Sequence, residues 1–244
     1  MKQRVGEKGG GKEAHLTENR LFEGLSAQER QRAVTSCIQK RYRRGEPVFS
    51  VGDSSEFIYI LEEGHVRLVS PGGGGLERIL NIFKPGDIFG EGLFSVRRRP
   101  YQAVAVDEAR VAIMSKATLL QYLSSSAQWG MNFIRLISDR LVSVQRDLAG
   151  LSNTWTRPRL AHLLLKLSDT LGVPTAQGTL IGVPVTHEAL ASMIGASRVR
   201  VTSNLNQLRR DGLLSKQGRF MVIRTEALRG WRDGNWRGRE PPSR

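Results

Sequence analysis

The residues of this sequence whose types and spacing best suit chemistry lie in a short segment that reads IGASRVRVTSNL. Arg198 and Arg200 flank Val199, and hydroxyl side chains follow at Thr202 and Ser203. A guanidinium group can donate paired hydrogen bonds to the edge of a guanine or to phosphate oxygens. The segment is therefore either a helix that contacts nucleic acid or a solvated surface helix. The elements predicted on either side of it distinguish these two interpretations.

The flanking residues predict two helices joined by a tight turn. Thr186 can cap the first helix, Gly195 suits a turn with positive φ, and Ser197 can cap the second helix. One face of the second helix is apolar and is expected to pack inward: Val201, Leu205 and Leu208. The following SKQGRFMVI predicts a hairpin that turns at Gln217-Gly218. Together these features predict a winged helix-turn-helix.

Such a fold places its second helix in the DNA major groove. Arg198 is the candidate for a guanine contact, Val199 can touch a thymine methyl, and Arg200, Thr202 and Lys216 can bind phosphates. The predicted DNA-binding residues are Ser197, Arg198, Val199, Arg200, Thr202, Ser203 and Lys216. Arg209 and Arg210, at the far end of the helix, are interpreted as solvated.

The charge distribution supports a polyanionic partner. The 244 residues carry a formal net charge of +14, and the 92 residues from position 153 contain 15 lysines and arginines against 6 acidic residues. A basic excess of this size attracts nucleic acid or anionic membrane. No apolar run approaches the roughly 20 residues of a membrane span, and the N-terminus does not resemble a signal peptide. We therefore expect a cytoplasmic protein that binds double-stranded DNA and no membrane.

The sequence offers little for catalysis or for metal binding. Cys37 is the single cysteine, which excludes an internal disulfide and a four-cysteine cluster, and the four histidines are scattered. The PGGGG run at 71–75 lacks the Gly-Lys-Ser/Thr of a phosphate-binding loop, and Asp87 after Pro85-Gly86 is explained as a turn residue. We expect neither an enzyme nor a metal site.

The apolar pattern predicts two further kinds of structure. A short amphipathic segment is expected to have Ser26 as its N-cap, with Glu29 three residues on. From Arg41 to about Ser115, short alternating runs between glycine turns predict an antiparallel barrel or roll. A single long helix is then predicted over 116–151.

The long helix carries a narrow apolar stripe. Its members recur at spacings of three and four residues, which is typical of a seam between two helices. The predicted dimer-interface residues are Phe133, Ile137, Leu141, Val144, Leu148 and Leu151. The alternative is that this stripe packs on the roll of its own chain.

We therefore predict an α+β protein with an N-terminal β-roll, a long dimerisation helix and a C-terminal winged helix-turn-helix. The predicted parts are a disordered basic tail at 1–18, a sensor roll at 19–115, a dimerisation helix at 116–152, a DNA-binding domain at 153–226 and an arginine- and tryptophan-rich tail at 227–244. The last part is interpreted as disordered.

From about Leu21 to Ile223 the chain resembles the CRP/FNR family of bacterial transcription regulators. The resemblance rests on VGDSSEFIYILEEGHVRLV, on KPGDIFGEGLF, which is similar to the family's phosphate-binding cassette, on the long helix, and on THEALASMIGASRVRVTSNLNQLRRDGLLS. It implies a homodimer in which each subunit joins a cyclic-nucleotide-binding-like roll to a winged helix. It further implies a palindromic promoter site and a contact with RNA polymerase.

The resemblance also implies an effector site in the roll, but this chain departs from the cyclic AMP receptors. Glu91 and Arg99 match the cassette's glutamate and arginine, whereas Pro100 replaces the serine that binds the cyclic phosphate. Val144 and Gln145 replace the threonine and serine that contact adenine. Cyclic AMP would thus lose several polar partners.

The stretch RRPYQAVAV is locally similar to the cyanobacterial nitrogen-control regulators, which sense 2-oxoglutarate. That similarity implies that Arg99 and Arg140 bind the ligand carboxylates, while Ser203 replaces an arginine common in both branches. The implied effector-binding residues are Phe89, Gly90, Glu91, Gly92, Leu93, Arg99, Tyr101, Arg140 and Val144. The alternatives are a regulator of this family with a degraded pocket and no effector, and a sensor module that regulates a protein partner.

Overall fold

The computed structural model describes residues 19–71, 77–151 and 155–236. Contacts group the chain into two compact units. The first comprises Met1–Leu68 with Asn81–Leu141, and the second comprises Val69–Leu80 with Val142–Arg244. The division therefore falls inside the long helix rather than at either of its ends.

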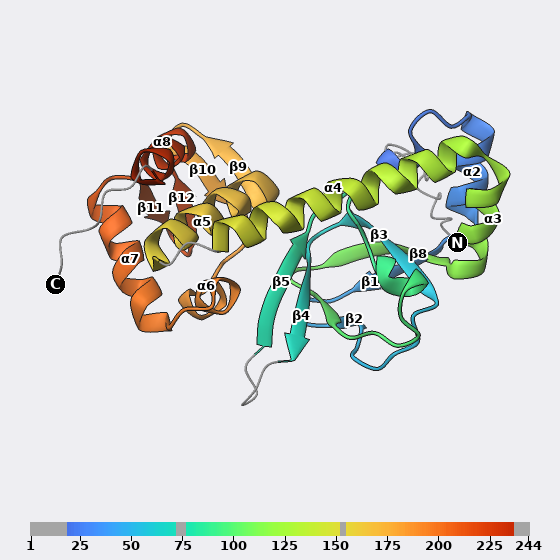
Figure 1. Ribbon diagram of the computed structural model, residues 1–244, viewed down its shortest axis with the longest axis horizontal. Coiled ribbons are helices and arrows are strands. Elements are labelled where there is room, and N and C mark those ends of the chain that lie inside the picture. The colour runs from blue at the N-terminus through green and yellow to red at the C-terminus, as the bar shows by residue number, and fades with distance from the viewer. Residues whose placement is uncertain (1–18, 72–76, 152–154, 237–244) are drawn as a thin grey trace, which may run out of the picture. The chain divides into compact units, whose positions relative to one another are not determined.

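Eight short strands form the predicted roll (Figure 1). They are β1 (Ile38–Tyr42), β2 (Pro47–Phe49), β3 (Phe57–Glu63), β4 (Val66–Pro71), β5 (Glu77–Phe83), β6 (Ile88–Phe89), β7 (Gln102–Ala105) and β8 (Ala109–Ser115). They make two four-stranded sheets in the orders β1-β8-β3-β6 and β2-β7-β4-β5. The pairs β1–β8, β3–β8, β3–β6 and β2–β7 are antiparallel, which confirms the predicted α+β roll.

Strand β3 shows how the sequence pattern builds this unit. Its side chains alternate between two apolar cores because successive residues of a strand point to opposite faces. Ile58 and Ile60 join the core that contains Trp129, and Tyr59 and Leu61 join the core of the roll interior. Both faces of β3 are thus covered, and its central residues are buried.

Helices cover the outer face of β3 and β8. They are η2 (Arg20–Phe22), α2 (Ala27–Thr35), α3 (Lys116–Ser125) and α4 (Ala127–Leu151), while a 3-10 turn η4 (Glu91–Phe94) follows β6. The Ser26 hydroxyl accepts from the Glu29 amide at 3.2 Å, and the Glu29 carboxylate accepts from the Ser26 amide at 2.8 Å. This reciprocal pair confirms the predicted N-cap.

The single helix predicted over 116–151 is wrong in one respect, because it breaks at Ser126 into α3 and α4. The hydroxyls of Ser124 and Ser125 donate to carbonyl oxygens of the preceding turn, at 2.7 and 2.9 Å, and such bonds compete with the helical ladder. Beyond the break, Trp129 is buried and its ring stacks on Tyr122 with centroids 4.8 Å apart. The short α3 therefore packs on the roll, and the apolar stripe belongs to α4 alone.

The second unit contains the predicted winged helix-turn-helix. Its elements are α5 (Thr156–Leu171), β9 (Gly172–Thr175), β10 (Gly178–Ile181), α6 (His187–Ile194), α7 (Arg198–Arg210), β11 (Leu214–Gln217), β12 (Phe220–Ile223) and α8 (Thr225–Trp236). The strands form one sheet in the order β11-β12-β10-β9. Helix α5 lies at the centre and contacts α6, α7, α8 and the sheet, with leucines buried along most of its length (Figure 1).

Helix α8 corrects the interpretation of the C-terminal segment as disordered, which is wrong for residues 227–236. Leu228 is completely buried, and Arg229 donates to the Asp169 carboxylate of α5 at 2.8 Å. Packing of an apolar residue against the rest of the unit stabilises this helix. The tail predicted at 1–18 and the last residues, 237–244, lie outside the described part of the chain.

No helix in the described ranges is both long enough and apolar enough to span a membrane.

Candidate functional site

The turn between α6 and α7 has the predicted geometry. The Thr186 hydroxyl accepts from the Ala189 amide at 3.0 Å, and the Ser197 hydroxyl accepts from the Arg200 amide at 3.3 Å, so each helix starts at its predicted cap. Gly195 has φ +62°, a left-handed conformation that glycine adopts without steric cost. The two helices are therefore held at a fixed angle by a short turn.

Helix α7 has one buried face and one open face. Val201, Leu205 and Leu208 are 0–1% exposed, as predicted. On the open face, Arg198, Arg200 and Ser203 are exposed and Val199 is 78% exposed. A valine so open to water does not pack against the described residues, and its apolar surface is available for contact with a partner.

Two other predicted residues lie beside α7. Lys216 is exposed on β11, the first strand of the wing, and pairs in register with Met221 of β12. Thr202 is half-buried, and its hydroxyl lies 2.9 Å from His187 Nδ1. The structure thus brings six of the seven predicted residues to one helix and places the seventh on the adjoining hairpin.

His187 is a member of this surface that was not among the residues predicted from the sequence, where the four histidines are scattered. It starts α6 and faces Thr202 of α7. Burial first, and then the positive charges of Lys216, Arg198 and Arg209, lower the pKa of His187. Its position directly after the Thr186 cap is the sequence feature that places His187 at the start of the first helix of the motif.

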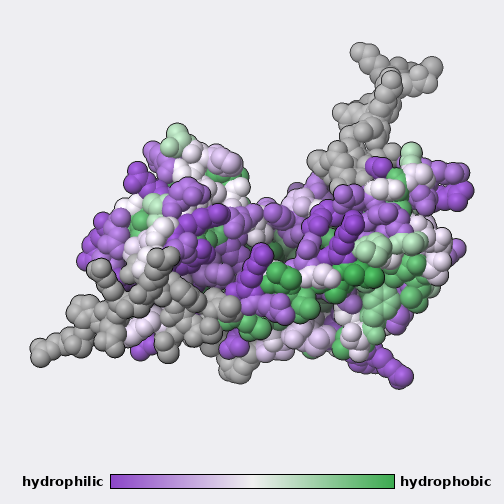
Figure 2. All heavy atoms as spheres, turned by 45° about the horizontal axis from the view of Figure 1, so that its top comes forward, coloured by the Kyte–Doolittle hydropathy of each residue, from purple (hydrophilic) through white to green (hydrophobic). Residues whose placement is uncertain are grey.

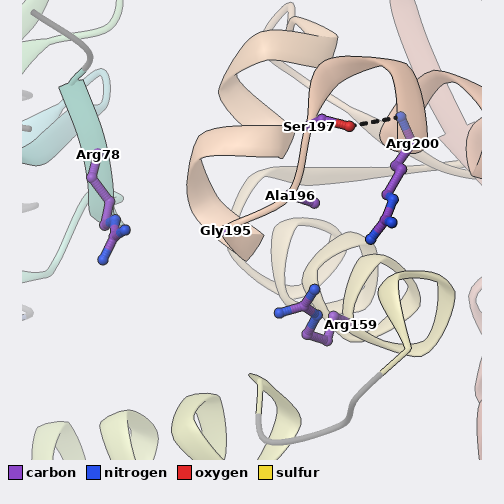
Figure 3. A pocket seen from close by; sticks show the side chains of 6 residues that line it. All are labelled: Arg78, Arg159, Gly195, Ala196, Ser197 and Arg200. Atoms are coloured by element: carbon purple, nitrogen blue, oxygen red, sulfur yellow. Dashed lines mark hydrogen bonds between the residues drawn. The ribbon is translucent and has the colours of Figure 1, made fainter. Parts of the chain in front are cut away.

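A pocket opens beside the turn that starts α7 (Figure 3). It has a volume of about 550 Å³. The lining residues are Arg78, Arg159, Gly195, Ala196, Ser197 and Arg200. Three arginines and the start of a helix make its lining strongly positive.

The roll contains a second concentration of positive charge, centred on Arg99. This residue is only 3% exposed, and its guanidinium lies over the rings of Phe49 and Tyr59, 4.6 and 5.5 Å from their centroids. It donates to the carbonyl oxygens of Gly90, at 2.9 Å, and Phe57. Burial lowers the pKa of Arg99, and its Nε has no hydrogen-bond partner in the described part of the chain.

Arg140 of α4 contacts β6, the strand that directly precedes Gly90. It donates to the Ile88 carbonyl at 2.9 Å and lies 4.7 Å from the ring centroid of Phe83. Phe83 stacks on Phe89, and Phe89 stacks on Tyr59, with centroid separations of 5.0 and 5.1 Å. Arg140 and Arg99 therefore bind opposite ends of one aromatic stack.

Among the predicted cassette residues, Phe89 belongs to this stack, Gly90 lies against its Tyr59 ring, and Leu93 joins the core that contains Trp129. Gly90 has φ +86°, and a Cβ there would lie 2.8 Å from Tyr59 Cδ2, so only glycine fits between the strand and the ring. Phe89 and Leu93 are buried, Glu91 and Gly92 are half-buried, and Tyr101 is 41% exposed. The predicted residue Val144 is placed on the apolar stripe of α4, with 45% exposure.

The stripe of α4 is open to solvent over most of its length. Its exposed members follow a strict three-four spacing: Ile134, Ile137, Leu141, Val144 and Leu148, at 38–62% exposure. Figure 2 shows hydrophobic side chains gathered on this face of the molecule, where α4 runs. A row of this kind is costly in water and suits a helix of a second subunit.

One predicted member of the stripe is misplaced. Phe133 is half-buried, packs against the helical core of its own unit and meets Phe94 edge-on with ring centroids 5.7 Å apart. Ile134, which is 56% exposed, lies in the open row instead of Phe133. The sequence pattern does not separate the two residues, because Phe133 is four positions and Ile134 three positions from Ile137. Leu151 ends α4, and its side chain is outside the described set.

No group of three metal-ligating side chains occurs among the residues that the structure describes. Burial, with a smaller contribution from Glu62, raises the pKa of the Cys37 thiol to about 12. The thiol therefore remains protonated at neutral pH, and Cys37 acts as a small apolar residue.

Known proteins share both halves of this arrangement. The profile of the cyclic nucleotide-binding domain matches residues 39–126, and that of the Crp-like helix-turn-helix domain matches 158–231. The "Cyclic AMP receptor protein" of Thermus thermophilus is 30% identical over 209 residues, covering 85% of this chain and 94% of its own. The "Global nitrogen regulator" of Nostoc sp. is 28% identical over 181 residues, covering 73% and 81%.

A solved structure agrees with these relatives. The crystal structure of a transcriptional regulator of the CRP family from Thermus thermophilus is 30% identical to this chain, with a TM-score of 0.68 and coverage of 80% of this chain and 97% of that one. The chain belongs to the CRP/FNR family of transcription regulators and carries its helix-turn-helix DNA-binding domain.

Proposed function

We propose that this protein is a homodimeric regulator that binds a palindromic DNA site and that a small anion bound in its roll gates the binding. The observation that carries the gating is the pair of arginines at the two ends of one aromatic stack. Neither Arg99 nor Arg140 forms an ion pair with an acid in the described residues, and Arg99 is almost completely buried. A desolvated cation of this kind is stabilised by a ligand that carries the missing negative charge.

The chemistry of the donors favours a dicarboxylate over a cyclic nucleotide. The buried Arg99 guanidinium suits one carboxylate of 2-oxoglutarate, and a guanidinium group can bind both oxygens of that carboxylate. Pro100, next to Arg99, supplies neither a hydroxyl nor an N–H for a cyclic phosphate, and Val144 supplies no polar atom for a base. Cyclic AMP remains the competing effector because residues 39–126, which include roll strands β2 to β8, match the family model of the cyclic nucleotide-binding domain.

The exposed apolar stripe of α4 supports the homodimer, since a parallel partner helix would bury its five open side chains. They are Ile134, Ile137, Leu141, Val144 and Leu148. With two subunits, each α7 reads one half-site: Arg198 contacts a guanine, Val199 a thymine methyl, and Arg200, Thr202, Ser203 and Lys216 the backbone and neighbouring bases. We further propose that the dimer acts in the cytoplasm, contacts RNA polymerase and performs no catalysis.

One observation favours a second candidate, a regulator of the same family without an effector. The two terminal nitrogens of Arg99 already donate to the carbonyls of Gly90 and Phe57. If these bonds persist in every state, the roll is a fixed scaffold and the free protein is competent for DNA binding.

Calorimetric titration of the full-length protein with 2-oxoglutarate, cyclic AMP and cyclic GMP separates the two candidates, with DNA affinity measured in parallel. The expected result is saturable binding of one ligand, a change in DNA affinity on binding, and loss of both in Arg99→Gln. A Lys40→Gln variant, which removes an exposed cation of β1, is the matched control and should respond normally. Strong DNA binding by the free protein with no response to any of the three ligands would favour the fixed scaffold.

A further inference from the structure

Two arginines of the second unit meet in the pocket beside the turn that starts α7. Arg159 reaches it from the first turn of α5, and Arg200 reaches it from the first turn of α7. Figure 3 shows both guanidinium groups pointing into the same space, next to Ala196 and Ser197. Two like charges that converge in this way repel each other unless an anion lies between them.

The described residues provide no such anion. Neither Arg159 nor Arg200 forms an ion pair with a described side chain, and the buried Nε of Arg159 has no hydrogen-bond partner there. Other arginines of this unit do donate to side-chain oxygens: Arg209 to Asn206, Arg210 to Gln207 and Arg229 to Asp169. The contrast sets the two pocket arginines apart, because no described side chain supplies them with a negative charge.

The helix ends at the pocket add to the positive field. The first turns of α5 and α7 contain no acidic residue, although acids are favoured there because the N-terminal end of a helix carries partial positive charge. Trp155, which precedes α5, has no side-chain oxygen with which to cap it. Arginines placed at two helix starts reduce the stability of the unit unless an anionic ligand compensates for them.

We propose that Arg159 and Arg200 together bind one phosphate of the DNA backbone in this pocket, so that α5 is part of the DNA-binding surface. The proposal rests on the proposed placement of α7 on DNA. Arg200 lies in the same helical turn as the exposed Arg198 and Val199, so a duplex that these two contact brings its backbone beside the pocket. Guanidinium groups match phosphate oxygens in shape and charge, and helix N-termini bind phosphate well.

The test measures the salt dependence of DNA affinity. Full-length protein first selects a duplex from a random library, and dissociation constants are then measured between about 50 and 200 mM NaCl. The slope of log affinity against log salt is expected to become shallower by about 0.9 in Arg159→Gln and in Arg200→Gln, the contribution of one phosphate. The double variant should lose no more than either single variant, because both arginines contact the same phosphate.

Two controls accompany these variants. Arg210→Gln removes a charge from the far end of α7 and should leave the slope unchanged. Arg159→Lys keeps the charge and should retain most of the slope, and thermal melting shows whether each variant is folded. If Arg159→Gln does not fold, duplexes with one uncharged methylphosphonate at successive positions give the same test: one position should weaken the wild type but not Arg200→Gln.

Unchanged slopes in both single variants would overturn the proposal, as would a double variant that loses twice the slope of a single one. A rise in melting temperature of the wild type with inorganic phosphate, without any change in slope, would also overturn it, because the pocket would then bind a free anion. Failure of the wild type to select any DNA sequence would contradict the proposed function itself, which is a separate result.

Discussion

At the residue scale, the open face of α7 presents two side chains whose chemistry suits different bases. Arg198 can pair with a guanine, whereas Val199, at 78% exposure, can contact only an apolar group such as a thymine methyl. The short turn and the two capping hydroxyls hold these side chains in place, so a specific contact requires little reorganisation. The predictions at this scale therefore concern single side chains on that face.

Replacing Arg198 with alanine is expected to weaken binding to the selected site by about 1–3 kcal/mol and to relax specificity at one base pair of each half-site. The measurement is a set of dissociation constants for the selected duplex and its single-base variants. Arg209→Ala, on the same helix but near its end, is the matched control and should keep the full specificity profile. Unaltered discrimination in Arg198→Ala would remove this residue as a base reader.

DNA affinity is expected to increase as the pH falls from about 8 to 6, and His187 is the group responsible. In the free protein, burial and the nearby Lys216, Arg198 and Arg209 lower the pKa of His187, so the ring is neutral at neutral pH. Negative phosphates brought by DNA raise that pKa, and a group that gains a proton on binding favours the complex at lower pH. Binding isotherms across this pH range measure the effect.

The matched variants for this prediction are His187→Gln and His65→Gln. His187→Gln should bind with a flatter pH profile, because glutamine cannot gain a proton. His65 lies in the first unit beside Asp107, and its replacement should leave the profile unchanged. A His187→Gln protein whose pH profile matches that of the wild type would refute the role of this side chain.

At the element scale, α4 packs against the first unit with one face and leaves an apolar stripe open on another. Its half-buried Phe133 and buried Trp129 and Asn132 attach it to the roll, and the row from Ile134 to Leu148 remains open. Near its C-terminal end, Asp147 accepts from Lys166 of α5 at 2.5 Å and lies 3.6 Å from His162. The helix thus carries both a candidate subunit seam and a polar link to α5.

Charge placed in the seam should separate the subunits. Leu141→Glu and Val144→Glu are expected to shift the protein from dimer to monomer, because two like charges would face each other across the partner helices. Sedimentation velocity at micromolar concentration measures the state. Val142→Glu, one residue away but outside the three-four row, is the control and should remain dimeric. A dimer that survives both seam variants would place the interface elsewhere.

Asp147→Asn is expected to lower the melting temperature by about 2–4 °C, as a loss of about 1 kcal/mol does for a chain of this size. Burial alone would raise the pKa of Asp147, but the nearby His162 and the hydrogen bond from Lys166 outweigh it and lower the pKa. The carboxylate therefore stabilises the protein above the unfolded-state pKa of aspartate, about 3.9, and loses this effect as the pH falls below that value. Equal melting of the variant and the wild type at pH 7 would contradict this link.

The sequence predicted the elements whose signals are local and missed features that depend on distant contacts. The caps at Ser26, Thr186 and Ser197 and the turn at Gly195 were predictable because each is set by neighbouring residues. The break at Ser126 and the helix α8 were missed, since one depends on Trp129 packing on Tyr122 and the other on Leu228 packing against α5.

The same distinction holds within the candidate sites. The residues of α7 could be named in advance because helical periodicity separates its faces. The role of Phe133 could not, because its contact with Phe94 joins residues 39 positions apart in the chain. Arg159 and His187 were missed because only the folded unit brings them to α7.

At the scale of the whole molecule, each of the two units carries one candidate binding site. The roll holds two arginines that form no ion pair with a described acid, and the second unit presents a basic, capped helix. Family membership establishes the DNA-binding domain, and the stripe of α4 offers a surface through which two copies can pair. We propose that two copies of this chain read one symmetric site.

Selection of duplex DNA from a random library by the full-length protein tests that claim most directly. The account predicts an enriched palindrome whose half-site centres lie about one helical turn apart, roughly 10–10.5 base pairs, and that is bound by two subunits. It also predicts that discrimination against random DNA persists as salt rises, because base contacts do not depend on counterion release. Binding without an enriched sequence, or enrichment of a single half-site by a monomer, would contradict the account.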